Sequence, residues 1–242
     1  LLGYASARVP EISDQYYSID DAMRTGYVWD FGPFEYWDLI GLEKGIELIK
    51  VRGGSVPEWI DELIAAGGTS FYKFEKGQKK YFNIQSKIYE PLPDSESFII
   101  LDSYREQSPV IKNSECTVHD IGDGVLCLEF TSKSNSIGEG ISKGLLETIQ
   151  LAEEGDWNGL VIGNNAKQFS VGANLMNIGM LAMQKQFDIL EHFVDEFQKI
   201  SMRIRTSKVP VVVATQGYVF GGGCEFSMHC DAGIYAAESY IG

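Results

Sequence analysis

The sequence predicts an α/β protein, with a small helical domain at residues 1–66 followed by an α/β domain at residues 117–242. Residues 1–66 contain helix-start signals, each followed by apolar residues at helical spacing. Residues 117–242 alternate β-branched segments with segments of helical periodicity, which is typical of βαβ units around a parallel sheet. Two glycine-rich loops follow two of these strand-like segments, and glycines let a backbone come close to a ligand.

Composition narrows the class of protein. The chain has 242 residues, 44% of them hydrophobic, so a packed core is expected and disorder is not. The formal charge of −14 argues against nucleic acid or an anionic membrane as the main partner. No segment reaches transmembrane length and no signal peptide is visible, so we expect a cytoplasmic protein. The cysteines lack CxxC spacing and the histidines are scattered, so we expect no metal and no disulfide framework.

Helix signals recur through residues 1–66. Ser18 begins a capping-box pattern, and Gly26 is placed to end the helix that follows. Gly32 and Pro33 start another helix, with proline in its first turn. Residues 55–58 start a third, which Gly67-Gly68 ends. We expect the core of this domain to account for its aromatic residues, which are Tyr27, Trp29, Phe31, Phe34, Tyr36 and Trp37.

The order of residues in two of these helices is more specific. Ile19-Asp-Asp-Ala-Met-Arg-Thr-Gly26 is followed by Phe31-Gly-Pro-Phe-Glu-Tyr-Trp-Asp-Leu-Ile-Gly-Leu42. This pattern resembles the C-terminal helical domain of 3-hydroxyacyl-CoA dehydrogenases, over about residues 1–66. In that family the NAD-binding loop and the catalytic His–Glu pair lie in an upstream Rossmann domain. No GxGxxG follows a strand here, so the resemblance implies a structural copy of the helical domain, with NAD bound outside this chain.

Residues 67–116 are expected to connect the two domains. Residues 71–82 predict a hairpin that turns at Lys76-Gly77. Pro91, Pro93 and Pro109 interrupt regular structure. The lysines of this segment fit a solvated face.

The α/β domain begins with a hairpin at residues 118–131, which turns at residues 122–124. A helix follows and ends at Gly155; residues 160–162 then form a strand. A long helix at residues 187–204, a strand at residues 211–214 and a strand at residues 232–237 complete the pattern. The two helices are predicted from apolar residues at helical spacing, which are Ile141, Leu145, Ile149 and Ala152 in the first and Phe187, Leu190, Val194, Phe197, Ile200 and Ile204 in the second.

The segment between the last two strands predicts a reactive site. Gly221-Gly-Gly-Cys-Glu225 opens a short helix, and a helix N-terminus offers unpaired N–H donors. Two such donors stabilise negative charge that develops on a carbonyl oxygen. Glycine at position 222 lets a ligand reach the backbone, and the Glu225 carboxylate one turn further can act on the ligand that those donors hold. The alternative for either loop alone is an ordinary turn between a strand and a helix.

The loops Phe169-Ser-Val-Gly-Ala-Asn-Leu175 and Gly217-Tyr-Val-Phe-Gly-Gly-Gly-Cys-Glu-Phe226 resemble those of the crotonase, or enoyl-CoA hydratase/isomerase, superfamily. The resemblance implies a truncated crotonase-like (ββα-repeat) domain. It also implies an oxyanion hole made by the backbone N–H groups of Ala173 and Gly222, with Glu225 as one of two acid/base glutamates. The neighbouring glycines are expected to bind the substrate, and these are Gly172, Gly221 and Gly223. The family's usual aspartate is replaced by Asn174, which leaves the backbone donor untouched.

Three lysines near these loops are candidates for contacts with the phosphates of coenzyme A: Lys133, Lys167 and Lys208. An ordinary solvated position is the better interpretation of each. The segment at residues 133–137 occupies the place of the first coenzyme A-contacting loop of the family, although its residues match that loop poorly.

The order of the two domains resembles the interior of multifunctional fatty-acid β-oxidation proteins. The resemblance implies a parent protein that hydrates trans-2-enoyl-CoA and oxidises the 3-hydroxyacyl-CoA product with NAD. We expect acyl-CoA as its partner, and a homo-oligomer. The alternatives are a crotonase-type isomerase or another acyl-CoA thioester enzyme, and a non-catalytic scaffold module.

Both ends of the sequence suggest a fragment of a longer protein, because it starts without methionine and stops inside a strand-like segment. The family's second catalytic glutamate is expected about three residues beyond Gly242. We therefore expect this fragment to have negligible hydratase activity and no dehydrogenase activity, since catalytic groups that act as a unit fail together.

Overall fold

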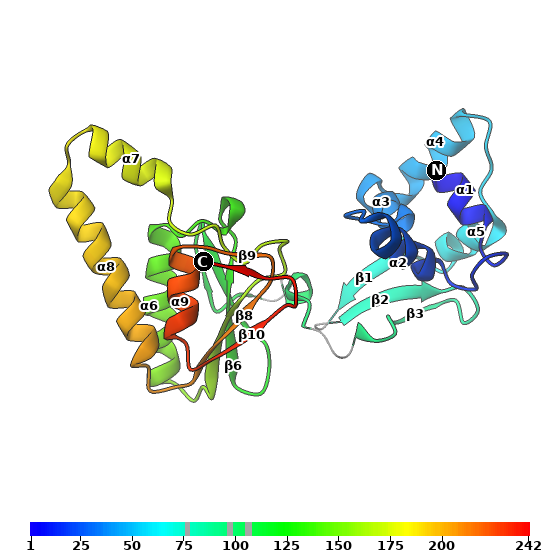
Figure 1. Ribbon diagram of the computed structural model, residues 1–242. Coiled ribbons are helices and arrows are strands. Elements are labelled where there is room, and N and C mark those ends of the chain that lie inside the picture. Colours follow the sequence, from blue (N-terminus) through cyan, green and yellow to red (C-terminus); the bar gives the residue numbers. More distant parts are fainter. Residues whose placement is uncertain (76–77, 96–98, 105–107) are drawn as a thin grey trace. The chain divides into compact units, whose positions relative to one another are not determined.

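A computed structural model describes residues 1–75, 78–95, 99–104 and 108–242. The chain divides into two compact units, Leu1–Ser103 and Tyr104–Gly242, and each has its own hydrophobic core (Figure 1). Residues 67–116, for which the sequence predicts a connector, are distributed between the two units.

The first unit combines short helices with a small antiparallel sheet. Its sheet order is β1-β2-β3, and Glu75 of β1 lies opposite Gln78 of β2. The predicted turn at Lys76-Gly77 lies outside the described residues. Phe71, Tyr81 and Phe82 of the sheet region belong to the same buried cluster as the helices, so the hairpin is part of this core. The elements are α1 (Leu2–Ala7), α2 (Tyr16–Tyr27), α3 (Pro33–Ile40), α4 (Leu42–Val51), α5 (Glu58–Ala65), β1 (Tyr72–Glu75), β2 (Gln78–Asn83) and β3 (Ile88–Pro91).

The helix-start signals had mixed outcomes. Gly32 and Pro33 begin α3 as predicted, and the amide of Gly32 donates to the Glu35 carboxylate at 2.9 Å. The prediction at Ser18 is wrong, because α2 already begins at Tyr16 and Ser18 lies within its first turn. Gly26 does not end α2 either, since the helix continues to Tyr27.

The expectation that the core accounts for the aromatic residues is correct only in part. Phe34 and Trp37 are fully buried, on the inner face of α3. Tyr27, Phe31 and Tyr36 are instead exposed, by 72%, 43% and 37%. Of the six aromatic residues, Tyr27 ends α2 and Trp29 and Phe31 lie between α2 and α3, so helical periodicity does not place these three on a buried face.

Two buried aspartates join α2 and α3 to the sheet region. Asp20 accepts hydrogen bonds from the amide of Phe34 at 2.9 Å and from the hydroxyl of Tyr72 at 2.7 Å. Asp38 accepts from the amides of Phe71 and Tyr72 at 2.7 and 2.9 Å. Burial raises the pKa of both carboxyls to about 6.

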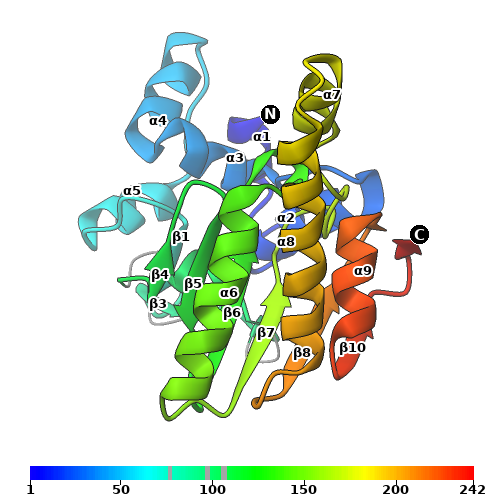
Figure 2. The same ribbon diagram turned by 90° about the vertical axis from the view of Figure 1, so that its left-hand side faces the viewer.

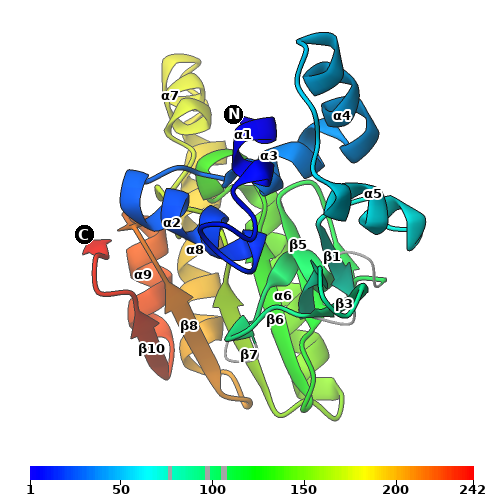
Figure 3. The ribbon, with the colours of Figure 1, turned by 90° about the vertical axis from the view of Figure 1, so that its right-hand side faces the viewer.

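The second unit contains a six-stranded sheet in the order β10-β8-β7-β6-β5-β4. Strands β6, β7, β8 and β10 are parallel, and β4 and β5 are added antiparallel at one edge. Figure 2 shows α6, α8 and α9 side by side over one face, and Figure 3 shows the strands from the other. These elements are β4 (Ile111–Lys112), β5 (Cys116–Asp120), β6 (Val125–Phe130), β7 (Gly159–Gly163), β8 (Val211–Thr215), β10 (Ala232–Tyr235), α6 (Glu139–Glu154), α8 (Phe187–Arg205) and α9 (Gly222–His229).

The strands and long helices of this unit confirm the sequence pattern. The first hairpin turns at Gly122–Gly124, and all four predicted core residues of α6 are buried before Gly155 ends the helix. The predicted long helix is confirmed by α8, although only part of its apolar series is fully buried. Ile200 and Ile204 are buried, whereas Phe187 and Val194 are 60% and 47% exposed.

Short segments form a further layer near the ends of the parallel strands. Strand β9 (Tyr218–Val219) pairs in parallel with β11 (Tyr240–Ile241). Isolated bridges join Ser170 to Val219 and Ile137 to Ala173. Helix α7 (Leu175–Met183) buries none of its residues. In the described part of the chain, no helix combines the length and apolarity that crossing a membrane requires.

Candidate active site

Two loops meet at the carboxyl-terminal edge of the parallel strands. One follows β7 and the other follows β8, and the two strands are neighbours in the sheet. The amide of Phe169 donates to the carbonyl of Gln216 at 2.8 Å, and the amide of Ser170 donates to the carbonyl of Tyr218 at 2.9 Å. The amide of Phe220 in turn donates to the carbonyl of Ser170 at 3.0 Å. These bonds hold the two loops in fixed register.

The loops come closest at Gly172. Its φ of +88° lies in the left-handed region, and a Cβ atom there would lie 2.8 Å from the carbonyl oxygen of Phe220. The same Cβ would be 3.4 Å from the backbone nitrogen of Gly222. Only glycine meets both requirements, so this residue sets the distance between the loops.

Backbone pairing with Ile137 determines the direction in which the N–H of Ala173 points. The amide of Ile137 donates to the carbonyl of Gly172 at 2.8 Å, and the amide of Asn174 donates to the carbonyl of Ile137 at 3.2 Å. Because successive peptide groups of an extended segment point in opposite directions, the N–H of Ala173 points away from Ile137. No acceptor for it is found among the residues that the structure describes.

The amide of Gly222 is unpaired for a different reason. Gly222 is the first residue of α9, where an N–H group has no partner within the helix. Within the described ranges it has no other acceptor, whereas the next amide, of Gly223, donates to Phe220 at 3.0 Å. A Cβ at position 222 would lie 2.9 Å from the ring of Phe197 and 3.2 Å from Ile137, so a side chain here would have to displace that ring.

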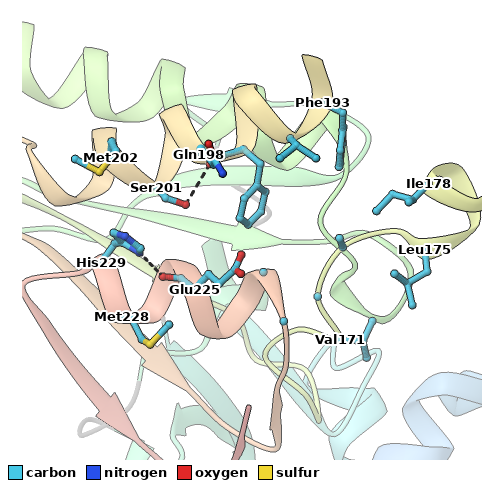
Figure 4. Close-up of a pocket in the computed structure, with 16 residues that line it drawn as sticks. Val171, Leu175, Ile178, Phe193, Gln198, Ser201, Met202, Glu225, Met228 and His229 are labelled. Carbon is cyan, nitrogen blue, oxygen red and sulfur yellow. Dashed lines mark hydrogen bonds between the residues drawn. The ribbon is translucent and has the colours of Figure 1, made fainter. Parts of the chain in front are cut away.

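These groups border a cavity of about 840 Å³ between the loops and helices α7, α8 and α9. Figure 4 shows Glu225 on the α9 side, with its carboxylate directed into the cavity, and Ile178 and Phe193 on the opposite side. Most of the lining is apolar. Gly172, Ala173, Gly221 and Gly222 line it, whereas Gly223 packs against Ser170 and is not part of the described lining.

A sequence profile of the enoyl-CoA hydratase/isomerase family matches residues 120–242, which is just over half of the chain. The chain belongs to the enoyl-CoA hydratase/isomerase family. The mixed α/β unit with its glycine loops is therefore a crotonase-type domain, as the sequence predicts.

Several relatives match the chain over different lengths. A probable 3-hydroxyacyl-CoA dehydrogenase of Bacillus subtilis is 38% identical over 244 residues, which cover 99% of this chain and 30% of the relative. A putative fatty acid oxidation complex trifunctional enzyme of Rickettsia felis is 25% identical over 229 residues, covering 93% of this chain and 28% of the relative. The chain thus spans less than a third of the length of each.

Shorter matches include proteins named enoyl-CoA hydratase. The mitochondrial enoyl-CoA hydratase of Pongo abelii is 31% identical over 116 residues, covering 48% of this chain and 38% of the relative. The crystal structure of an enoyl-CoA hydratase from Thermoplasma volcanium matches with a TM-score of 0.46 and 28% identity, over 54% of this chain and 51% of that one.

Other polar residues of this hydratase/isomerase domain position its loops. The buried hydroxyl of Ser170 donates to the carbonyl of Asn135 at 2.7 Å and accepts from the amide of Gly172 at 3.0 Å. Asn174 begins α7, and its side chain accepts from the amide of Asn177 at 3.4 Å. The substitution at this position therefore still supplies a helix cap.

The candidate lysines lie at two different edges of the sheet. Lys133 follows β6 and Lys167 follows β7, so both lie at the edge that carries the glycine loops. Lys208 precedes β8 and therefore lies at the opposite edge, where its amide donates to Glu153 at 3.0 Å. The structure thus separates Lys208 from the site.

Two thiols of the domain are poorly ionised, and two of its histidines make contacts on their own helices. Burial raises the pKa of Cys127 and of Cys230 to about 12, so neither is a ready nucleophile. His229 contacts the backbone carbonyl of Glu225 through Nδ1 at 2.7 Å. His192 lies with Asp195 and Glu196 on an exposed face of α8, a grouping that the sequence analysis missed, and Lys199 pairs with both carboxylates.

Proposed function

We propose that this domain is part of an enzyme that hydrates trans-2-enoyl-CoA thioesters. One observation carries the proposal: the amides of Ala173 and Gly222, unpaired among the described residues, lie beside one cavity with the carboxylate of Glu225. The cavity is mostly apolar, as an acyl group requires.

The residues would divide the reaction as follows. The thioester carbonyl accepts hydrogen bonds from the two amides, which stabilise the negative charge that develops when water adds to the double bond. Removal of one such donor typically raises the barrier by about 3–4 kcal/mol. Glu225 lies one helical turn beyond Gly222, so its carboxylate can transfer a proton at the carbons adjacent to the carbonyl.

We further propose that the whole protein couples this hydration to oxidation of 3-hydroxyacyl-CoA by NAD. Support comes from the dehydrogenase-like pattern of residues 1–66 and from the names of the relatives in Bacillus subtilis and Rickettsia felis. NAD would bind to a part of the protein outside these residues, because no glycine loop of the NAD-binding type follows a strand here.

A coupled assay of the full-length protein tests this function. After crotonyl-CoA is added, its absorbance should fall as the conjugated double bond is hydrated. NAD should then be reduced to NADH. If crotonyl-CoA is not consumed and no NADH forms, the proposed function is excluded. Hydration without NADH would leave the hydratase and exclude the dehydrogenase.

The family also contains isomerases, so isomerisation of a 3-enoyl-CoA is the second candidate. Glu225 favours hydration, because the isomerases that this sequence resembles rely on the other acid position. Product analysis after incubation with 3-enoyl-CoA separates the two: an isomerase forms the 2-enoyl-CoA, and a hydratase leaves the substrate unchanged.

A further inference from the structure

We propose that Ser170 is a positioning residue of the site, and that its side chain sets the direction and separation of the two amides that would bind the thioester oxygen. This inference rests on the proposed function, because it takes that oxygen to lie between the amides of Ala173 and Gly222. Ser170 is fully buried and is not part of the described lining of the cavity, so it acts through the two loops rather than on the substrate.

The hydroxyl of Ser170 fixes the conformation of Gly172. It accepts a hydrogen bond from the amide of Gly172 at 3.0 Å, which holds the peptide group before that residue. The peptide group after it is held by the amide of Ile137, which donates to the carbonyl of Gly172 at 2.8 Å. Only the φ and ψ torsions of Gly172 lie between these two peptide groups. Glycine allows many combinations of φ and ψ, so the two bonds together select one and thereby direct the N–H of Ala173.

The side chain of Ser170 also supports the start of α9. A Cβ atom added to Gly223 would lie 2.7 Å from the Cβ of Ser170 and 3.1 Å from its Oγ, so the helix backbone lies directly against this side chain. Gly223 follows Gly222, whose amide is the second donor. Ser170 therefore contacts the residue before one donor and the residue after the other, and its size sets how far apart the two donors lie.

Asn135 determines the orientation of the Ser170 hydroxyl. The carbonyl of Asn135 accepts the hydroxyl proton at 2.7 Å, which leaves the lone pairs of the oxygen for the amide of Gly172. The side chain of Asn135 is buried and donates to the carbonyl of Gln168 at 2.9 Å. Its φ of +52° lies in the left-handed region, which asparagine adopts more readily than most residues. Asn135 thus ties the turn after β6 to the loop that carries Ser170.

Loss of the hydroxyl should affect the transition state more than substrate binding. Ser170→Ala keeps the Cβ that supports α9, but it leaves the amide of Gly172 and the carbonyl of Asn135 buried without this partner. Gly172 then gains conformational freedom, and the N–H of Ala173 is no longer held toward the oxygen. Because negative charge on that oxygen develops only during the reaction, a misdirected donor lowers kcat more than it weakens binding.

Hydration of crotonyl-CoA by the full-length protein, measured without NAD, tests the inference. Removal of a whole donor typically costs roughly 10²–10³-fold, so we expect misdirection of one donor in Ser170→Ala to reduce kcat by about tenfold and to change KM by less than about threefold. Thermal unfolding of the same preparation gives the folded fraction at the assay temperature, by which kcat is corrected.

Thr148→Val is the matched control. Thr148 is a fully buried residue of α6, and its hydroxyl donates to the carbonyl of Gly144 at 2.6 Å. The variant therefore removes a buried hydroxyl of the same domain at a position that does not line the described cavity. It should leave kcat, after the same correction, within about twofold of the unmodified protein.

The infrared spectrum of bound butanoyl-CoA, isotopically labelled at its carbonyl carbon, gives a readout that a merely structural role would not change. Hydrogen bonds to a carbonyl oxygen lower its stretching frequency, so Ser170→Ala should shift the band back toward that of free butanoyl-CoA, whereas Thr148→Val should not. Asn135→Gly tolerates the positive φ and keeps the carbonyl that accepts from Ser170, and it removes only the bond to Gln168. It should shift the band in the same direction by less, and it decides the question if Ser170→Ala does not fold.

A band at the same frequency in the unmodified protein and in the folded variants of Ser170 and Asn135 would overturn the inference. A corrected kcat of Ser170→Ala within about twofold of the unmodified value would overturn it as well. If the unmodified protein did not hydrate crotonyl-CoA at all, the proposed function itself would fail.

Discussion

At the scale of single residues, the site depends on positions that leave no room for a side chain. We predict that Gly222→Ala destabilises the domain by about 1–3 kcal/mol, because the new Cβ would overlap the ring of Phe197 at 2.9 Å. Displacement of the Gly222 amide should also reduce hydration by roughly 10²–10³-fold. Urea unfolding of the 242-residue chain and an enoyl-CoA assay of the full-length protein with the same substitution measure the two effects.

Gly179→Ala is the control for this substitution. Gly179 lies within α7, and nothing is within 4 Å of the Cβ that alanine would add. Alanine favours a helix over glycine by roughly 0.5–1 kcal/mol, so this variant should be slightly more stable than the unmodified protein. Equal losses of stability in both variants would contradict the role given to the Phe197 contact.

A second prediction concerns Glu225. Replacement of the carboxylate by an amide of the same shape, Glu225→Gln, should reduce hydration by roughly 10²–10⁴-fold, because it removes a proton-transfer group and little volume. Binding of butanoyl-CoA should change by less than about threefold, since the amides of Ala173 and Gly222 remain. An unchanged rate would favour the scaffold alternative over an enzyme.

At the scale of elements, the attachment of α2 and α3 to the sheet region should depend on pH. Burial raises the pKa of Asp20 to about 6, above its value of 3.8 in the unfolded chain. The folded state therefore binds the additional proton between these two values. It follows that this carboxyl makes the first unit more stable as the pH falls from 7 toward 4, and that the gain is lost as the pH rises through 6.

The shift of about two units corresponds to roughly 3 kcal/mol at most. Glu35 acts in the opposite direction: although its burial favours the neutral form, Lys79 and Arg24 hold its pKa below the ordinary value. The pH dependence of the total unfolding free energy therefore contains both contributions, and the contribution of Asp20 must be measured as a difference. Asp20→Asn cannot ionise, so subtracting its unfolding free energy from that of the unmodified protein at pH 5 and pH 7 isolates the contribution. Parallel pH profiles would show that Asp20 does not titrate as described.

The sequence was most informative where a signal repeats along an element. The four buried residues of α6 and the hairpin at Gly122–Gly124 follow from periodicity and turn chemistry alone. The prediction at Ser18 failed because packing in the core, rather than the capping pattern, determines where α2 begins. Tyr16 is fully buried, and its hydroxyl donates to the carbonyl of Phe71 at 2.5 Å. Strands β9 and β11 have two residues each, too few for any periodic signal.

The sequence suffices to propose the candidate site residues, but it does not define their geometry. The glycine motifs gave Ala173, Gly222 and Glu225, but the direction of the Ala173 amide depends on its pairing with Ile137, 36 positions earlier in the sequence.

At the scale of the whole molecule, the two hydrophobic cores are separate. The cluster of the first unit includes Leu63 and Phe71, that of the second includes Leu128 and Ile162, and the two clusters have no buried residue in common. Because cooperativity in unfolding arises from shared packing, separate cores allow each unit to unfold at its own temperature. This bears on function, since the first unit and the hydratase/isomerase unit can then be altered independently.

We therefore predict two calorimetric transitions for the 242-residue chain, each sensitive to one core. Leu63→Ala removes a fully buried side chain from the first unit and should lower one transition, by about 2–5 kcal/mol of unfolding free energy. Leu128→Ala, equally buried in the second unit, is the matched variant and should lower the other. Three of the four tryptophans, Trp29, Trp37 and Trp59, belong to the first unit, so fluorescence should follow mainly the transition that Leu63→Ala shifts. A single transition that both variants lower equally would mean that the two cores unfold as one.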